Sequence, residues 1–439
     1  MSTAPNRTPA EEAYISSFED AQSGWLASKR REGHAAFGEL GLPHRRIEAW
    51  KFTDLRRLVD GAYPPLTDAS LVDVDQVQQL AKQSIFSGIE RATAVFVDGR
   101  FRRELSKLPE DEALEVFSIA DSPDSAPSWI SDNLGQIVPQ ADDAVSALNI
   151  AYMIDGAAIR VSGQANAPLE LIFIQTGAEA RTITTRNLVI LDDNAASEIY
   201  ESHIAPAGTR YFNNIVTEVK LGDGARLDHV KVQAESAEAI HLSNLHALLG
   251  GDAKLNSFTA TVGARVSRQQ GFIEYAGENT EAQVSGAYLL AGKQHGDTTL
   301  VVDHAVPNCT SRELFKIVLD DYARGVFQGK VCVRPHAQKT DGKQMAQALL
   351  LAPDAEFDSK PELEIFADDV VCGHGATAGE LDEDLLFYLR ARGIPKDEAM
   401  GLLVAAFVGE AFEEVESEPV REALGEMAAS WLTSHKKGA

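Results

Sequence analysis

The stretch VVCGHGAT, residues 370 to 377, places a thiol and an imidazole two positions apart among glycines. On an extended strand, residues i and i+2 point to the same side, so Cys372 and His374 would present sulfur and nitrogen together to one soft metal ion. Gly373 and Gly375 would let another backbone approach closely. The residues leave three interpretations open: a metal site, a catalytic pair, or an exit turn in which Cys372 is a core residue.

The cysteines limit what metal chemistry this chain can do alone. Cys309, Cys332 and Cys372 are odd in number and far apart, which is not a disulfide framework, and there is no C-x-x-C pair. A conventional structural zinc site or a four-cysteine cluster therefore needs more ligands than the thiols present, and any metal site must draw on histidines, carboxylates or a second protein. Cys332 alternates within a strand-like run and is expected to point into the core, whereas Cys309 could be exposed and its role is left open.

Eight of the 11 histidines fall between residues 203 and 374: His203, His229, His241, His246, His295, His304, His336 and His374. A lone histidine is more often a structural residue with satisfied hydrogen bonds than a ligand. Only His374 has a thiol two positions away, so only His374 and Cys372 are singled out as candidate metal ligands.

The charge balance argues against one class of partner. Lys and Arg number 40 against 66 Asp and Glu, a formal net charge of -26, which is unsuited to a nucleic-acid phosphate backbone. The N-terminus lacks the basic and apolar regions of a secretory signal, and no run of about 18 apolar residues could span a bilayer. We therefore expect a cytoplasmic protein that has reduced thiols and binds neither nucleic acid nor membrane.

The common catalytic and nucleotide-binding motifs are absent from the sequence. It contains no G-x-x-x-x-G-K-[ST], no G-x-G-x-x-G between a strand and a helix, no G-x-S-x-G and no H-E-x-x-H. We therefore expect no enzyme activity and no nucleotide bound by this chain itself. The alternative is a carbohydrate-active enzyme built on a β-helix, which would need a cluster of acidic or basic residues on one coil face, whereas the aspartates here are explained by turns.

Residues 1–150 are expected to form a mostly helical N-terminal domain. Apolar residues recur at helical spacing between residues 11 and 40, and Asp98-Gly99 is a strong hairpin-turn pair between two strand-like runs. The basic, aromatic segment 41–58 is interpreted as a docking segment whose Trp50 and Phe52 pack on the body of the protein. The other interpretation is a surface that meets a partner or an anion.

Residues 151–371 consist of short alternating or apolar runs typical of strands. An apolar run, an acidic or glycine turn and an alanine recur, with separations of 30, 28, 70 and 32 between the markers Ala195, Ala225, Ala253, Ala323 and Ala355. The gap of 70 leaves room for two further units, around Glu278 and His295. A period near 30 indicates stacked coils that bury a continuous core. We predict a mainly β fold: a right-handed parallel β-helix flanked by N-terminal and C-terminal helical domains, in preference to a propeller or a sandwich.

Residues 372–439 return to a helical pattern and are expected to form a C-terminal domain of three helices. The first has Asp382 to Asp384 in its first turn and Arg390 and Arg392 in its last, as the helix dipole favours. The second carries a broad apolar face between residues 400 and 412. Three helices are too few to bury these faces alone, so part of this surface should rest on the β-helix or on another protein.

Several of these segments together resemble the SufB/SufD family of iron-sulfur cluster assembly proteins over nearly the whole chain. The segments are RRIEAWKFTDLRRL, SALNIAYMIDGAAIRV, NCTSRELFKIVLDDYARGVFQGKVCV, QKTDGKQMAQALLL and VVCGHGATAGELDEDLLFYLRARGIPKDEA. SufB-type chains carry a cysteine near the position of Ala346, and this chain has none there. In lacking this cysteine and in carrying the CGHGAT motif, the chain resembles the SufD-type members of the family more than the SufB-type members.

The resemblance implies a non-enzymatic scaffold subunit of a SufB-SufC-SufD complex that supports iron acquisition and cluster assembly. It implies a heterodimer with SufB through the β-helices and docking of the ATPase SufC on the C-terminal helices; alone, the chain could form a homodimer. His374 would lie at the SufB interface as a candidate ligand of a transient iron-sulfur cluster shared with SufB, with Cys372 as the weaker candidate. A purely structural role for His374, in packing the heterodimer, is the remaining alternative.

Overall fold

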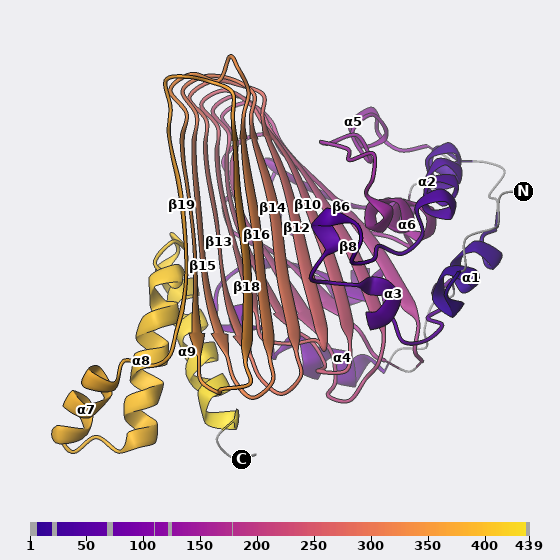
Figure 1. The fold of residues 1–439 in the computed structure, drawn as a ribbon. Helices are drawn as coiled ribbons and strands as arrows, with labels where there is room; N and C mark the ends of the chain where they lie inside the picture. The colour runs from indigo at the N-terminus through magenta and orange to yellow at the C-terminus, as the bar shows by residue number, and fades with distance from the viewer. Residues whose placement is uncertain are drawn as a thin grey trace, which may run out of the picture.

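The computed structural model describes residues 7–19, 24–67, 73–108, 110–121, 125–177 and 179–435. A parallel β-solenoid of about eight turns lies between N-terminal and C-terminal helices (Figure 1). The mainly β fold and the parallel β-helix predicted from the period near 30 residues are confirmed. No helix in the described part of the chain is long and apolar enough to cross a membrane.

Each turn of the β-helix contributes one strand to each of two facing sheets. The odd sheet contains β1, β2 and the odd-numbered strands from β5 to β19, and the even sheet contains β3 and the even-numbered strands from β4 to β18. The strands are β1 (Ala92–Val97), β2 (Arg100–Phe101), β3 (Leu114–Ser118), β4 (Ala157–Val161), β5 (Leu169–Ile174), β6 (Thr182–Leu191), β7 (Ala196–Ile204), β8 (Phe212–Leu221), β9 (Arg226–Ala234), β10 (Ile240–Leu249), β11 (Lys254–Thr261), β12 (Val266–Tyr275), β13 (Glu281–Leu290), β14 (His295–His304), β15 (Thr310–Leu319), β16 (Arg324–Val333), β17 (Asp341–Leu350), β18 (Glu356–Ile365) and β19 (Val371–Gly379). Apolar side chains from both sheets fill the space between them as one core.

The turns from the even sheet to the odd sheet explain the repeat. In six of these turns, those before β7, β9, β11, β13, β15 and β17, a residue with positive φ precedes the next strand by two positions: Asn194, Gly224, Asp252, Asn279, Asn308 and Lys339. Asn, Asp and Gly adopt this conformation at the least steric cost. In each of these six turns the residue that follows is buried: Ala195, Ala225, Ala253, Thr280, Cys309 and Thr340. Small side chains therefore recur there because each coil stacks directly on the one before.

The alanine markers belong to two sets of turns. Ala323 and Ala355 lie in turns that lead back to the even sheet, so they are not in phase with Ala195. Glu278 lies in the turn before β13, and His295 is the first residue of β14. Further coils therefore occupy the gap of 70 residues.

Helices of the N-terminal region cover the outer face of the even sheet (Figure 1). The helices of this region are α1 (Pro9–Ser16), α2 (Ala27–Leu40), η1 (Glu48–Trp50), α3 (Leu55–Leu58), α4 (Val74–Ala81), η2 (Ile85–Gly88), η3 (Arg103–Leu105), η4 (Ile119–Asp121), α5 (Ser128–Ser131) and α6 (Ala144–Tyr152). Of these, α4, η2 and η3 pack instead on the outer face of the odd sheet. The predicted hairpin at Asp98-Gly99 is confirmed, because both residues have positive φ and β1 pairs antiparallel with β2. β1 also pairs in parallel with β5, so this region extends the β-helix as well as covering it.

The basic, aromatic segment 41–58 docks on the even sheet through Trp50. Its ring is buried, and the guanidinium of Arg268 lies 3.9 Å from the ring centroid. Arg268 also donates a hydrogen bond to the carbonyl oxygen of Ala49 at 2.7 Å. Phe52, expected to pack in the same way, is only half-buried. Trp50 therefore holds the segment in place.

The C-terminal helices are α7 (Glu383–Ala391), α8 (Lys396–Phe412) and α9 (Glu418–His435). Apolar residues of α8 and α9, among them Val404, Val408 and Leu424, pack on the outer face of the odd sheet against residues such as Phe258 and Val318. The expectation that part of the helical surface rests on the β-helix is confirmed. α7 projects away from the sheets beside α8 (Figure 1) and has no buried residue.

Candidate metal-binding end of the β-helix

Cys372 and His374 lie in β19, the last strand of the odd sheet, at the end of the stack opposite to α1 and α2 (Figure 1). They pair in register with Gly342 and Gln344 of β17, which face the interior. The predicted common side is therefore confirmed by the register, and it is the inward side. Residues 371–379 are strand rather than an exit turn, so β19 continues past residue 371, where the β-helix was expected to end.

The interior behind His374 is a column of aligned residues, one from each coil. The register from β9 to β19 joins His229, Ser257, Val284, Glu313, Gln344 and His374, which are 27 to 31 positions apart. The last three are polar, and their exposure rises from buried Glu313 and Gln344 to exposed His374. A Cβ at Gly329 on the facing sheet would collide with the amide oxygen of Gln344, so a larger residue there would force this side chain to move.

The Cys372 thiol sits half-buried beside this column. It packs at the edge of a small apolar cluster that includes Val331 and Ala367. Burial raises the pKa of this thiol, and the carboxylates of Asp341 and Glu313 raise it further. The thiol is therefore protonated at neutral pH in the free chain, and a cation that enters would favour the thiolate.

The same end of the molecule has unpaired strand edges and exposed apolar side chains. Among the described residues nothing pairs with the outer edges of β18 and β19. The exposed fractions are 67% for Phe366 and 62% for Val371. A groove of about 690 Å³ adjoins β19 and is lined by Leu314, Met345 and Glu414 among others. Unpaired edges with apolar neighbours are templates for another chain.

The donor set at this end is incomplete. Within the described ranges, no group of three or more His, Cys, Asp or Glu side chains is arranged to hold a metal ion. Cys372 and His374 therefore supply at most two ligands by themselves. Because tetrahedral iron or zinc takes four, the remaining ligands would have to come from outside this pair.

The other two cysteines lie where the sequence did not predict. Cys332, expected in the core, is on the outer face of β16 and half-buried, because the interior positions of that strand are Phe327, Val331 and Val333. Burial raises the pKa of its thiol to about 11. Cys309, which could have been exposed, is fully buried in the core at the turn position that Ala195 occupies in an earlier coil.

Three interior histidines belong to a buried polar network. His203 and His229 each lie beside the carboxylate of Glu201, at 3.2 and 3.3 Å. His241 lies 2.5 Å from the carboxylate of Glu235, and burial lowers the pKa of this imidazole to about 4. Each of these imidazoles is paired with a buried carboxylate inside the coil, which is a structural role.

Three further histidines have structural partners, and one is exposed. His246 contacts the carbonyl oxygen of Val138 at 3.1 Å, His295 the hydroxyl of Thr53 at 2.8 Å, and His304 the hydroxyl of Ser311 at 3.1 Å. Burial lowers the pKa of His295 and of His304 to about 4. His336 lies exposed in the turn before β17. Of the eight histidines between residues 203 and 374, only His336 and His374 are therefore exposed.

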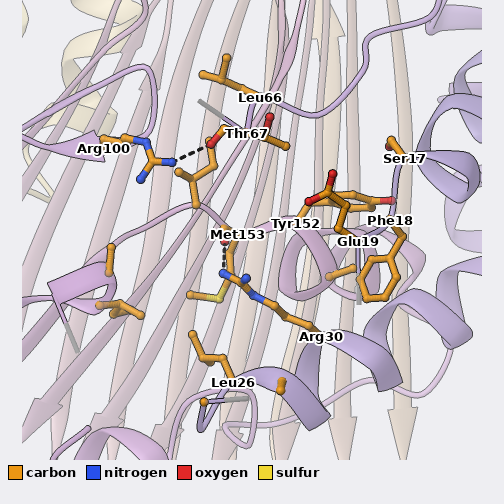
Figure 2. A pocket seen from close by; sticks show the side chains of 16 residues that line it. Ser17, Phe18, Glu19, Leu26, Arg30, Leu66, Thr67, Arg100, Tyr152 and Met153 are labelled. Atoms are coloured by element: carbon orange, nitrogen blue, oxygen red, sulfur yellow. Dashed lines mark hydrogen bonds between the residues drawn. The ribbon is translucent and has the colours of Figure 1, made fainter. Parts of the chain in front are cut away.

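A second cavity of about 530 Å³ lies among the N-terminal helices (Figure 2). Arg30 donates to the carbonyl oxygen of Met153 at 2.9 Å, and Arg100 donates to that of Thr67 at 2.8 Å. The described lining residues include neither cysteine nor histidine. This cavity is therefore not part of a soft-metal site, and it lies at the opposite end of the molecule from β19 (Figure 1).

Comparison with known proteins agrees with the fold and with the motifs. Residues 173–407 match the SUF system FeS cluster assembly, SufBD core domain, and residues 12–169 match the SufBD protein N-terminal region. An iron-sulfur cluster assembly SufBD family protein of Synechocystis sp. is 32% identical over 421 residues, which cover 92% of this chain and 90% of the relative. The iron-sulfur cluster assembly protein SufD of Escherichia coli is 28% identical over 426 residues, 96% of each chain. A SufBD family protein of Mycobacterium leprae is 32% identical over 392 residues, covering 87% and 88%.

These matches cover both the N-terminal region and the β-helix with its C-terminal strands. They support iron-sulfur cluster assembly over the alternative of a carbohydrate-active β-helix enzyme. The chain belongs to the SufBD family of the SUF iron-sulfur cluster assembly system.

Proposed function

We propose that this chain is a non-enzymatic scaffold subunit of a SUF complex and that a nascent iron-sulfur cluster forms at the open end of its β-helix. The observation that carries the proposal is the position of Cys372 and His374 on the edge strand β19, as an incomplete set of ligands. A SufB-type partner would supply the missing thiolates. The cluster is the cargo of the complex and is shared across the interface.

The free edge of the odd sheet suits pairing with the β-helix of that partner. β19 has an N–H at every position, whereas Pro361 removes one donor from β18. Strand addition satisfies the unpaired backbone groups and would bring a second set of side chains beside His374. In the absence of a SufB-type partner, a second copy of this chain could occupy the same edge as a homodimer.

The exposed face of α7 suits docking of a SufC-type ATPase. Phe387 is 73% exposed, and Leu385 and Tyr388 are each about half exposed. Aromatic side chains clustered on one projecting helix are typical interface anchors. Because the chain has no phosphate-binding loop, the partner would hold the ATP. Movement of the bound ATPase subunits would be transmitted to the open end of the β-helix through α8, which contacts β15.

His374→Ala is expected to reduce cluster formation at least about ten-fold while the complex stays intact, because a ligand is removed from an exposed position. The measurement is cluster absorbance after anaerobic reconstitution of the co-purified three-protein complex with iron and sulfide. His336→Ala, at another exposed histidine, is the matched control. Loss of the complex on size-exclusion chromatography would instead assign His374 to packing. An unchanged absorbance would remove it from the site.

Phe387→Asp is expected to weaken ATPase binding by about 2 kcal/mol, or about 30-fold in Kd, without changing the melting temperature, because the side chain is largely exposed in the free chain. Binding would be measured by titrating the purified ATPase against the full chain. Tyr322→Asp changes another exposed aromatic, in a turn of the β-helix, and serves as the control. Equal affinities for both variants would place the docking surface elsewhere.

A further inference from the structure

Three buried oxygen atoms near the open end make no hydrogen bond of normal geometry, although the nearby Ser311 hydroxyl lowers the pKa of the Glu313 carboxyl. They are both carboxylate oxygens of Glu313 and the amide oxygen of Gln344. Both side chains are only 3% exposed. Buried acceptors without a partner are uncommon, because the desolvation free energy of each is not compensated by a hydrogen bond. Two neighbouring residues with this deficit indicate that a binding partner is missing from the interior.

The two residues are neighbours in the column that ends at His374. Glu313 of β15 pairs with Gln344 of β17, and Gln344 pairs with His374 of β19. Neighbouring strands are about 4.8 Å apart, so Glu313 lies about 10 Å behind the exposed histidine with Gln344 between them. The amide nitrogen of Gln344 already donates to the carbonyl oxygen of Gly329 at 3.3 Å, which leaves its amide oxygen free for another group.

The surrounding side chains offer no cation to these oxygens. Arg312, next to Glu313 in sequence, points outward and pairs with Asp341 at 2.7 Å. Lys343 also lies on the outer face and is 3.5 Å from the same carboxylate. On the facing sheet the inward positions nearest Gln344 are Gly329 and Val331, which carry no donor side chain. An ion from solution would therefore have no competing protein cation beside Glu313 and Gln344.

We propose that Glu313 and Gln344 form an interior oxygen-ligand site for one divalent metal ion, which enters through the open end past His374 and Cys372. A carboxylate and an amide oxygen are ligands for Mn²⁺ and Fe²⁺ rather than for a soft ion. The residues at the entrance, a thiol and an imidazole, prefer softer or borderline ions. The inference that this ion is iron held for the nascent cluster rests on the proposed function. The inference that a divalent ion binds at Glu313 does not.

Two other partners would also satisfy these oxygens and give different experimental results. A proton is one, because burial raises the pKa of the Glu313 carboxyl to about 8, and Ser311 and Arg312 offset this only in part. An internal water molecule is the other. In either case Glu313→Gln would leave metal binding unchanged, so metal titration separates both from the ion.

The test is a titration of the full chain with Mn²⁺ alone, in which free Mn²⁺ is followed by electron paramagnetic resonance. The wild type is expected to bind one ion that Glu313→Gln binds at least about ten-fold more weakly. Asp341→Asn is the matched control, because it removes the same charge from the outer face of the neighbouring strand. Gln344→Leu is the second variant and should also weaken binding. Melting temperatures show that each variant is folded, and Glu313→Gln should melt no lower than the wild type.

A parallel titration with Co²⁺ keeps this inference distinct from the proposed function. Thiolate ligation gives an intense charge-transfer absorption, which Cys372→Ala should abolish and Glu313→Gln should retain. Equal Mn²⁺ binding by the wild type and Glu313→Gln, or no binding by either, would overturn the interior site. Loss of Mn²⁺ binding in Glu313→Gln, together with normal cluster assembly in His374→Ala, would keep the interior site and refute the proposed role of His374.

Discussion

Acidification from about pH 7 to about pH 4 is expected to unfold the protein, because several buried imidazoles are held neutral. Burial lowers the pKa of His241, His295 and His304 from 6.5 to about 4 in each case. The unfolded chain binds these protons near pH 6.5, whereas the folded protein resists them until about pH 4. Stability from these groups is therefore fully present above pH 6.5 and is lost as the pH falls through this window.

The expected loss is comparable with the total stability of a domain. Protonating each imidazole costs about 3 kcal/mol more in the folded protein than in the unfolded chain, so three contribute about 10 kcal/mol. Glu235 adds to the loss below its ordinary pKa, because the neighbouring His241 holds the pKa of its carboxyl low despite burial. Glu313 has the opposite effect on the free energy of unfolding. Burial raises the pKa of its carboxyl to about 8, so this group destabilises the folded protein at pH 7 by about 3 kcal/mol, and acidification to about pH 4 removes that destabilisation. The net loss of about 7 kcal/mol falls within the range of 5 to 15 kcal/mol typical of whole domains.

Urea unfolding followed by circular dichroism at a series of pH values would measure this loss. The free energy of unfolding should fall steadily below about pH 6.5. His336→Gln, which changes an exposed histidine, should reproduce the wild-type curve. A free energy of unfolding that stays constant down to about pH 4 would show that the three imidazoles titrate normally in the folded protein.

Arg268→Met is expected to destabilise the protein by about 3–5 kcal/mol, because it leaves the buried carboxylate of Asp297 without its cation. Arg268 is 1% exposed, forms an ion pair with Asp297, and stacks on Trp50. Thr53 also donates a hydrogen bond to this carboxylate. The change therefore affects both the β-helix and the docking of the segment 41–58.

The double variant Arg268→Met/Asp297→Leu separates the charge from the packing. Removing both members of a buried pair costs much less than removing one, so this variant should regain most of the lost stability. The measurement is the free energy of unfolding from urea titration. If the double variant is as unstable as Arg268→Met, the loss comes from packing on Trp50 rather than from the unpaired carboxylate.

The linear order of residues determined the architecture and the location of the site. Short strands separated by turns of Asn, Asp or Gly recur near every 30 residues, and stacking is the arrangement that lets each coil bury its inward face. The motif around Cys372 and His374 falls at the end of the repeat, so an end of the β-helix was predictable. The apolar faces of the C-terminal helices, which exceed what three helices can bury, likewise predicted packing on the β-helix.

The tertiary structure alone decided which way individual side chains face. A period of two defines alternation but not phase, and the run around Cys332 has apolar residues on both sides, so the sequence did not show that its thiol faces outward. The burial of Cys309 depends on its equivalence to Ala195 several coils away. The contact of Glu313 with Gln344 and the pairing of Arg268 with Trp50 join residues 31 and 218 positions apart. Such contacts follow from register and docking, which local pattern does not encode.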